Sequence, residues 1–426
     1  MPNWPFSFVH AGDLHLDQPL YGVAEVPDHL RDLFVDAPYK AAERVFDTAL
    51  AERVDFLILA GDVLHPWSSG PRGPLFLIEQ FQRLRERKIP VFWAGGRVDL
   101  PELWPAGLTL PDNVHVFPAG RAASHTVDRD GQPVAVVAGA SLARGSRLNT
   151  ADFQADPSGL FTVGVAHVPA DAAAGGQMDY WALGGCHGHM TLLGGRKTTH
   201  YAGSPQGRDS DECGPHGCTL VEVDHDGLAH LTRKTVDVVR WHAERIDLAA
   251  GAAVETVERL LAERMRSLIA STGGPDLLVN WSLSTPAPLA GRLRQGTLAE
   301  ELLATLRREF GYGRPAAWSL SLDVEPTESV PAAHLKEESL LGDYLRSIRQ
   351  YQADETSPLD LSPWLETGRG TSALAVNGQA GLAIWEASQD LRQRLGAVQG
   401  PDARRRVLDE ALCLGLELLS GEGPKT

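Results

Sequence analysis

Acidic and imidazole side chains recur in four short stretches of the sequence, and their chemistry suits a divalent cation. The first stretch is Asp13-Leu14-His15, and the second runs from Gly61-Asp62 to His65. The third is His167 alone, and the fourth is Gly184 to His189, which includes His187. Oxygen and nitrogen ligands without thiolates favour Mn²⁺, Fe²⁺ or Zn²⁺ over Ca²⁺. The four stretches therefore predict a transition-metal site, provided that the fold brings them together.

Each of these stretches follows an apolar run that predicts a buried β-strand. The runs are residues 6–10, 55–60, 161–166 and 180–183. In open α/β sheets, ligands bind at the carboxyl ends of the strands. One such cluster alone is usually a structural cap or a satisfied hydrogen bond. Four in succession predict a shared site at one edge of a sheet.

The elements between these clusters predict a layered α/β fold in residues 1–240. Residues 40–54 and a stretch around 77–84 have apolar side chains at helical spacing, and 90–93 and 134–137 are further strand candidates. Residues 219–235 predict a hairpin around an Asp-His-Asp-Gly turn. Alternation of strands and helices is typical of a sheet covered by helices.

The pattern changes after residue 240. Residues 241–326 combine two amphipathic helices with two strand patterns, which predicts a small α+β capping domain. Residues 327–426 predict a helical C-terminal region that docks a partner. We therefore expect three parts, 1–240, 241–326 and 327–426.

Composition restricts the function further. The 426 residues include 39 Lys and Arg and 55 Asp and Glu, a net charge of −16, which excludes DNA binding by bulk positive charge. Four cysteines in so long a chain do not make a disulfide framework, and no long apolar run predicts a membrane span. With no leader-like start, the sequence predicts a cytoplasmic protein without a membrane anchor.

The order of these motifs resembles the calcineurin-like metallophosphoesterases, and within them the SbcD/YhaO-like DNA repair exonucleases. Residues 8–17 look like the opening of that branch, and residues 201–208 and 217–224 look like its later segments. The resemblance implies a metallophosphoesterase-type β-sandwich flanked by helices, followed by the cap and the helical region.

The resemblance also implies a metal centre. Asp13, His15, Asp62 and His187 would hold one ion, most commonly Mn²⁺, and Asp62 would bridge to a second ion that His167 also binds. The two ions of such a centre bind phosphate oxygens and activate water for phosphodiester hydrolysis.

This sequence departs from the family pattern at the second ion. Matched without a gap, residues 95–98 (Gly-Gly-Arg-Val) replace the family's Gly-Asn-His-Asp, so the Asn ligand is Gly96 and the histidine is Arg97. Residues 184–187 (Gly-Gly-Cys-His) likewise replace Gly-His-x-His and lack one histidine. A shift of two residues would instead pair His187 with His189, and Asp99 could replace the lost carboxylate. We favour the match that needs no insertion.

Two further residues are candidates for catalysis. Arg97 could hold a phosphate by its permanent charge, although it cannot donate a proton, or it could simply pair with a nearby acid in a decayed site. His65 stands where the family often has a phosphate-facing polar group, and a structural hydrogen bond is its other interpretation.

These observations predict a metal-dependent phosphodiesterase or nuclease that acts on DNA, resembling the DNA repair exonucleases. The resemblance implies an SMC-like coiled-coil ATPase as partner and a possible homodimer. The alternative is a catalytically impaired scaffold subunit that binds the same ATPase, and a phosphoesterase for small esters is a third hypothesis.

Overall fold

The computed structural model describes residues 4–23, 26–66, 70–168, 177–249, 252–285, 289–295, 297–325 and 334–353, with 404–405, 407–409, 411–412 and 415. The chain divides into two compact units. The first consists of residues 1–243, 265–280 and 310–320, and the second of residues 244–264, 281–309 and 321–426. Within the described residues, no helix is long and apolar enough to cross a membrane.

A six-stranded sheet in the first unit carries two of the predicted metal-binding stretches. Its strand order is β12-β11-β1-β2-β3-β4. The strands β1, β2, β3 and β4 are parallel to one another, and β11 pairs antiparallel with β1 and with β12. The bounds are β1 (Phe6–Ala11), β2 (Phe56–Leu59), β3 (Val91–Trp93), β4 (Val114–Val116), β11 (Gly217–Val223) and β12 (Ala229–Thr235).

A second six-stranded sheet, in the order β5-β6-β7-β8-β10-β9, carries the other two stretches. Its central strands β6, β7, β8 and β10 are parallel, so their carboxyl ends also lie at one edge. The bounds are β5 (Ala123–Arg129), β6 (Gln132–Ala140), β7 (Thr162–His167), β8 (Tyr180–Gly184), β9 (Met190–Leu193) and β10 (Thr198–Tyr201).

The two sheets pack face to face through an aromatic and β-branched core. Phe8 and Phe56 of the first sheet stack with their ring centroids 4.7 Å apart, and Tyr180 of the second sheet meets Phe8 edge-on. Val163 and Val165 of β7 are fully buried in the same cluster. Since each strand face buries alternate residues, this core fixes the register of both sheets. The predicted β-sandwich flanked by helices is confirmed.

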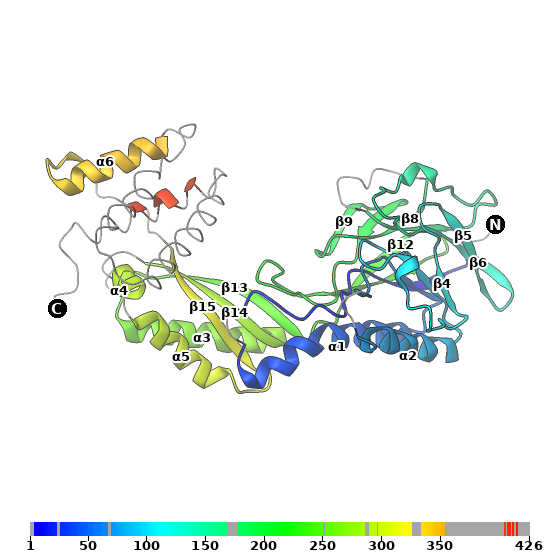
Figure 1. Ribbon diagram of the computed structural model, residues 1–426, viewed down its shortest axis with the longest axis horizontal. Coiled ribbons are helices and arrows are strands. Elements are labelled where there is room, and N and C mark those ends of the chain that lie inside the picture. Colours follow the sequence, from blue (N-terminus) through cyan, green and yellow to red (C-terminus); the bar gives the residue numbers. More distant parts are fainter. Residues whose placement is uncertain are drawn as a thin grey trace, which may run out of the picture. The chain divides into compact units, whose positions relative to one another are not determined.

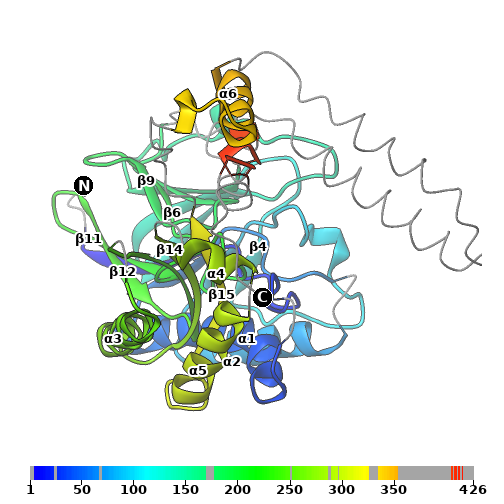
Figure 2. The ribbon, with the colours of Figure 1, turned by 90° about the vertical axis from the view of Figure 1, so that its left-hand side faces the viewer.

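Two helices cover the outer face of the first sheet. The helices α1 (Asp28–Glu52) and α2 (Arg72–Glu86) lie side by side in both views (Figure 1 and Figure 2). Val45 and Phe46 of α1 and Leu77 and Phe81 of α2 are fully buried against the sheet residue Leu57. The sequence pattern predicted both helices and their buried faces.

The first helix begins twelve residues earlier than its apolar pattern indicates, and it contains Pro38. A proline inside a helix removes the amide that would bond the carbonyl four residues before it, here that of Phe34. The amide of Leu20 donates to this carbonyl instead, at 3.2 Å. Phe34 itself is buried in a cluster with Trp241. Tertiary burial and this replacement bond together account for the continuous helix.

The rest of the chain contains a three-stranded sheet in the order β13-β14-β15. Among the described residues, α3 connects β13 to β14, α4 and α5 lie between β14 and β15, and α6 follows β15. Each predicted helix and strand between 254 and 325 is present. The bounds are β13 (Val239–Asp247), α3 (Val254–Thr272), β14 (Asp276–Ser284), α4 (Leu289–Gln295), α5 (Leu298–Phe310), β15 (Ala317–Glu325) and α6 (Leu340–Ala353). Short 3-10 helices span Pro101–Leu103, Thr150–Asp152 and His334–Lys336.

The division into the parts 1–240, 241–326 and 327–426 stays a prediction. Most of the predicted helical region 327–426 lies outside the described residues, including all of 354–403.

Candidate metal centre

The four predicted stretches meet at one edge of the sandwich. Asp13 and His15 follow β1, Asp62 follows β2, His167 ends β7, and His187 follows β8. The sequence pattern predicted that these residues follow strand ends, as they do, but it placed them at the edge of a single sheet. The strands β1 and β2 belong to one sheet and β7 and β8 to the other, so the site lies where the parallel strands of both sheets end.

Backbone hydrogen bonds join the loop after β1 to the loop after β2. The amide of Asp13 donates to the carbonyl of Gly61 at 2.8 Å, and the amide of His15 donates to the carbonyl of Asp62 at 3.0 Å. Asp13, His15 and Asp62 all have left-handed backbones, with φ of 52°, 44° and 51°. A left-handed conformation costs free energy for residues other than glycine, and such strain concentrates at functional sites. The surrounding fold thus holds the backbone of these three residues in a conformation that is unfavourable for residues other than glycine.

Asp13, His15 and His187 form the first group of converging ligand atoms, all within 4.8 Å of one another. The Nε2 atoms of His15 and His187 are 3.3 Å apart, and His187 Nε2 is 4.0 Å from Asp13 Oδ1. His15 Nε2 also lies 4.0 Å from Asp62 Oδ2. Burial, and then the positive charge of Arg208, lower the pKa of His15 to about 2, so its ring is neutral and its nitrogen is free to bind a cation.

Asp13, Asp62 and His167 form a second group, which shares Asp13 with the first. His167 donates from Nδ1 to the carbonyl of Ala60 at 3.1 Å, which connects the two sheets. Its Nε2 atom is buried without a hydrogen-bond partner, 3.5 Å from Asp62 Oδ2. A buried nitrogen without a partner beside a carboxylate fits a bound cation, because it otherwise pays the full cost of desolvation.

A charged pair behind His187 completes the site, and the sequence analysis did not identify its role. Glu212 Oε1 accepts a hydrogen bond from His187 Nδ1 at 2.6 Å, which turns Nε2 toward His15. Arg208 donates to Gln18 Oε1 at 2.5 Å, and its Nη2 is 3.1 Å from His187 Nδ1. Burial is the largest single effect and opposes ionisation of Glu212, but the hydrogen bond from His187, the charge of His187 and the contacts of Arg208 together outweigh it and lower the pKa of Glu212 to about 2. A carboxylate in this position orients a metal-binding histidine and raises its basicity.

Asp99 is not a replacement ligand. Its Oδ1 accepts the amides of Asp62 and Gly96 at 2.9 and 2.6 Å, and its Oδ2 accepts the amide of Val63 and the indole of Trp93 at 3.1 and 2.8 Å. Burial, and then the charge of Asp62, raise the pKa of Asp99 to about 6. This carboxylate therefore holds the loops after β2 and β3 together. Each of its oxygens already accepts two N–H groups, so neither has a lone pair available for a metal ion.

His189 also lies apart from both groups. Its ring packs edge-on against His200 with the centroids 4.7 Å apart, and His200 in turn faces His10. The geometry therefore places His187, and not His189, with Asp13 and His15, in agreement with the ungapped match.

The two candidate catalytic residues have different surroundings. His65 is half-buried, and its Nε2 is 3.1 Å from His15 Nδ1, so that it orients the His15 ring from the side opposite His187. Burial lowers the pKa of His65. Arg97 is exposed, and its amide donates to Asp62 Oδ1 at 2.6 Å. That His65 and Arg97 contact the substrate stays a prediction.

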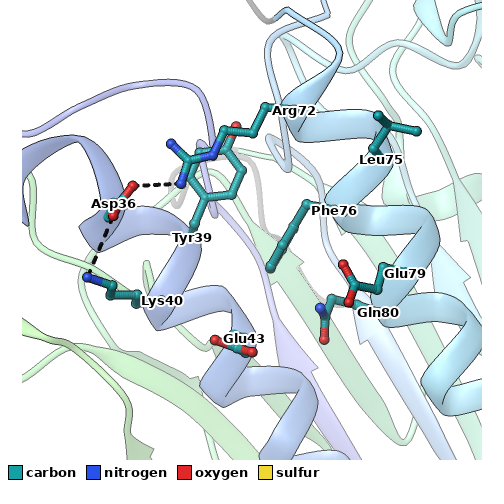
Figure 3. A pocket seen from close by; sticks show the side chains of 9 residues that line it. All are labelled: Asp36, Tyr39, Lys40, Glu43, Arg72, Leu75, Phe76, Glu79 and Gln80. Carbon is teal, nitrogen blue, oxygen red and sulfur yellow. Dashed lines mark hydrogen bonds and ion pairs between the residues drawn. The ribbon is translucent and has the colours of Figure 1, made fainter. Parts of the chain in front are cut away.

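A surface pocket lies apart from the centre, between α1 and α2 (Figure 3). Its volume is about 440 Å³, and none of the predicted metal ligands lines it. The guanidinium of Arg72 lies over the ring of Tyr39, 3.9 Å from its centroid, and pairs with Asp36 at 2.6 Å. Beneath it, the hydroxyl of Tyr39 donates to Asp17, which follows the ligand loop after β1. Tyr39 thus connects the pocket floor to the segment that carries Asp13 and His15.

A family model and two known proteins are similar to parts of this chain. Residues 6–137 match the family model of the calcineurin-like phosphoesterases. The uncharacterized metallophosphoesterase YhaO of Bacillus subtilis (strain 168) is 28% identical over 337 residues, which are 75% of this chain and 81% of that protein. A crystal structure of a dimetal phosphatase from Danio rerio covers 52% of this chain and 93% of its own, with a TM-score of 0.32 and 10% identity.

The chain therefore has a metallophosphoesterase-type fold with the signature of the calcineurin-like phosphoesterases, and YhaO is a distant homologue. The calcineurin-like phosphoesterases bind divalent metals, and in this chain the two groups of converging side chains are the candidate ligands. The coarser resemblance expected from the sequence is thus confirmed, whereas its DNA repair branch is not.

Proposed function

We propose that this protein is a metal-dependent phosphodiesterase that cleaves DNA, similar to the SbcD/YhaO-like exonucleases, with Mn²⁺ as its ion. The observation that supports it most is the convergence of Asp13, His15, Asp62, His167 and His187 from four strand ends. Carboxylates and imidazoles together suit a transition metal, and such an ion would polarise a phosphoryl oxygen and lower the pKa of water.

The residues of the chain would divide the work. Asp13, His15, Asp62 and His187 hold the ion, and Glu212 keeps His187 in the orientation that presents Nε2. His65 orients His15 through Nδ1, and because its side chain is only half-buried we also assign to it the contact with a phosphate oxygen or the leaving group.

The segments that resemble the exonuclease branch lie close to this centre. Arg208 ends the 201–208 segment and contacts His187, and the 217–224 segment forms β11 beside β1. The net charge of −16 fits a protein that meets DNA at a local metal site while an SMC-like ATPase partner holds the duplex.

A nuclease assay tests the proposal. The purified chain, alone and with the ATPase partner, is incubated with Mn²⁺ and linear duplex or single-stranded DNA. We expect cleavage that requires Mn²⁺ and falls at least 100-fold in Asp62→Asn, because this change removes a charged metal ligand. Asp128→Asn on β5 makes the same change at an exposed site and should leave cleavage unchanged. No cleavage under any of these conditions would contradict the proposal and favour the scaffold alternative.

A further inference from the structure

The glycines at positions 96 and 185 stand where a second ion would need ligands. They occupy the positions of the Asn and of the first histidine in the ungapped match, so neither offers a donor side chain. A Cβ atom on Gly96 would lie 2.4 Å from Asp62 Oδ1 and 2.9 Å from His167 Nδ1. A Cβ atom on Gly185 would lie 3.1 Å from His167 Nε2. The backbone at Gly96 and Gly185 lies so close to His167 that a metal-binding side chain at either position would require the neighbouring atoms to move.

Backbone amides also donate hydrogen bonds to the carboxylate oxygens that a second ion would need as ligands. Asp62 Oδ1 accepts the amides of Arg97 at 2.6 Å and Val98 at 3.1 Å, so Oδ2 alone is directed at the histidines. Both oxygens of Asp13 accept the amide of Gly185, at 3.2 and 2.9 Å.

The remaining donors make one complete ligand set. Both candidate groups depend on Asp13, so two ions would compete for it. Without Asp13, a second ion would have only Asp62 Oδ2 and His167 Nε2, which are 3.5 Å apart. Two protein ligands fall short of the three or four that hold transition metals in proteins.

Arg97 brings a positive charge to this same loop. Its amide is anchored on Asp62, while its side chain is exposed, and its guanidinium makes no hydrogen bond or ion pair with any residue in the described part of the chain. A guanidinium binds two phosphate oxygens at once and stays charged at any physiological pH. The pairing of Arg97 with a nearby acid, expected for a decayed site, is not seen among these residues.

We propose that this chain has a mononuclear metal centre in which Arg97 supplies the phosphate-binding charge that a second ion supplies in two-metal enzymes. Asp13, His15, Asp62 and His187 hold the single ion, and His167, whose Nε2 lies 3.5 Å from Asp62 Oδ2, does not hold a second one. The inference deepens the proposed phosphodiesterase function, because it specifies how the same site binds a phosphate group.

Metal stoichiometry tests the first half of this inference without any DNA. The protein is saturated with Mn²⁺, freed of excess ion by gel filtration, and measured by elemental analysis and electron paramagnetic resonance. We expect one ion per chain and the six-line spectrum of an isolated Mn²⁺. Two ions per chain with a spin-coupled spectrum would overturn the inference, and so would the absence of any bound ion.

Phosphate binding tests the second half. Titration of the Mn²⁺-loaded protein with inorganic phosphate is followed by calorimetry in wild type, Arg97→Gln and Arg97→Lys. We expect Arg97→Gln to bind phosphate at least tenfold more weakly, and Arg97→Lys to recover part of the affinity, since a charge-assisted hydrogen bond is lost in the first and a point charge remains in the second.

Arg87→Gln is the matched control. Arg87 is exposed at the end of α2, before β3, and therefore at the opposite edge of the sheet from Arg97. This variant should bind phosphate as wild type does. Equal phosphate affinity in Arg97→Gln and wild type would overturn the role of Arg97, whether or not the protein cleaves DNA.

Discussion

Glu212 offers a sharp test of how the fold prepares His187 for a metal ion. Two replacements separate charge from contact. Glu212→Gln keeps an oxygen that can accept from His187 Nδ1 but removes the negative charge, whereas Glu212→Ala removes both. Glu212 is well shielded, with its side chain 12% exposed, so solvent weakens this interaction only modestly.

The expected magnitudes follow from the 2.6 Å contact between Glu212 Oε1 and His187 Nδ1. A hydrogen bond to a charged group contributes about 1.5 kcal/mol more than a neutral one, which corresponds to about tenfold in affinity. We therefore expect Glu212→Gln to weaken Mn²⁺ binding about tenfold. Glu212→Ala should weaken it about 100-fold, because the ring loses its orientation and the guanidinium of Arg208 is left beside it without a counter-charge.

Metal affinity is measured at pH 7 by competition with a chelating dye. Glu222→Gln serves as the control, because Glu222 is an exposed residue on β11 and the change in charge is the same. Circular dichroism shows whether each variant is folded. A folded Glu212→Ala variant that binds Mn²⁺ within twofold of wild type would refute the role assigned to this carboxylate.

Three further predictions concern buried polar groups. Burial lowers the pKa of His200 to about 3, from about 6.5 in an unfolded chain, so its stabilising effect is complete above pH 6.5 and lost as the pH falls toward 3. Its contribution to the unfolding free energy should fall by about 2 kcal/mol from pH 7 to pH 5. In urea unfolding, the loss of stability between these pH values should therefore be smaller in His200→Gln than in wild type. The exposed control His225→Gln should lose as much stability as wild type. Asp99→Asn should lower the unfolding free energy by about 3 kcal/mol, since each oxygen of Asp99 accepts two N–H groups and the amide would oppose two of them; a loss under 1 kcal/mol in denaturant titration would be inconsistent with this network. Tyr39→Phe should cost about 2 kcal/mol, because it removes the hydroxyl that Asp17 accepts, and unchanged unfolding would show that this contact does not stabilise the ligand loop.

The sequence predicted the strand ends at which the metal ligands lie. Asp13 and Asp62 follow strands that the apolar runs define, and His167 and His187 follow strands of the second sheet. Parallel pairing brings the carboxyl ends together within each sheet, but the packing that brings the edges of the two sheets together is a tertiary contact that the sequence pattern does not reveal.

Other features depend on contacts that the sequence does not reveal. Glu212 lies 25 residues after His187 in a polar loop without periodicity, so nothing local marks it as the partner of that ring. The sequence alone leaves Asp99 with two possible roles, a metal ligand or a carboxylate that stabilises its loop. The four N–H groups that it accepts in the structure show the second role. The early start of α1 likewise depends on Leu20 replacing the hydrogen bond that Pro38 removes.

Anomalous diffraction from crystals grown with Mn²⁺ would test the metal centre most directly. We predict one strong peak per chain, bounded by Asp13, His15, Asp62 and His187, and no second peak of comparable height beside His167. A peak elsewhere in the molecule, or none at this edge of the sandwich, would contradict the metal site and every functional proposal that depends on it.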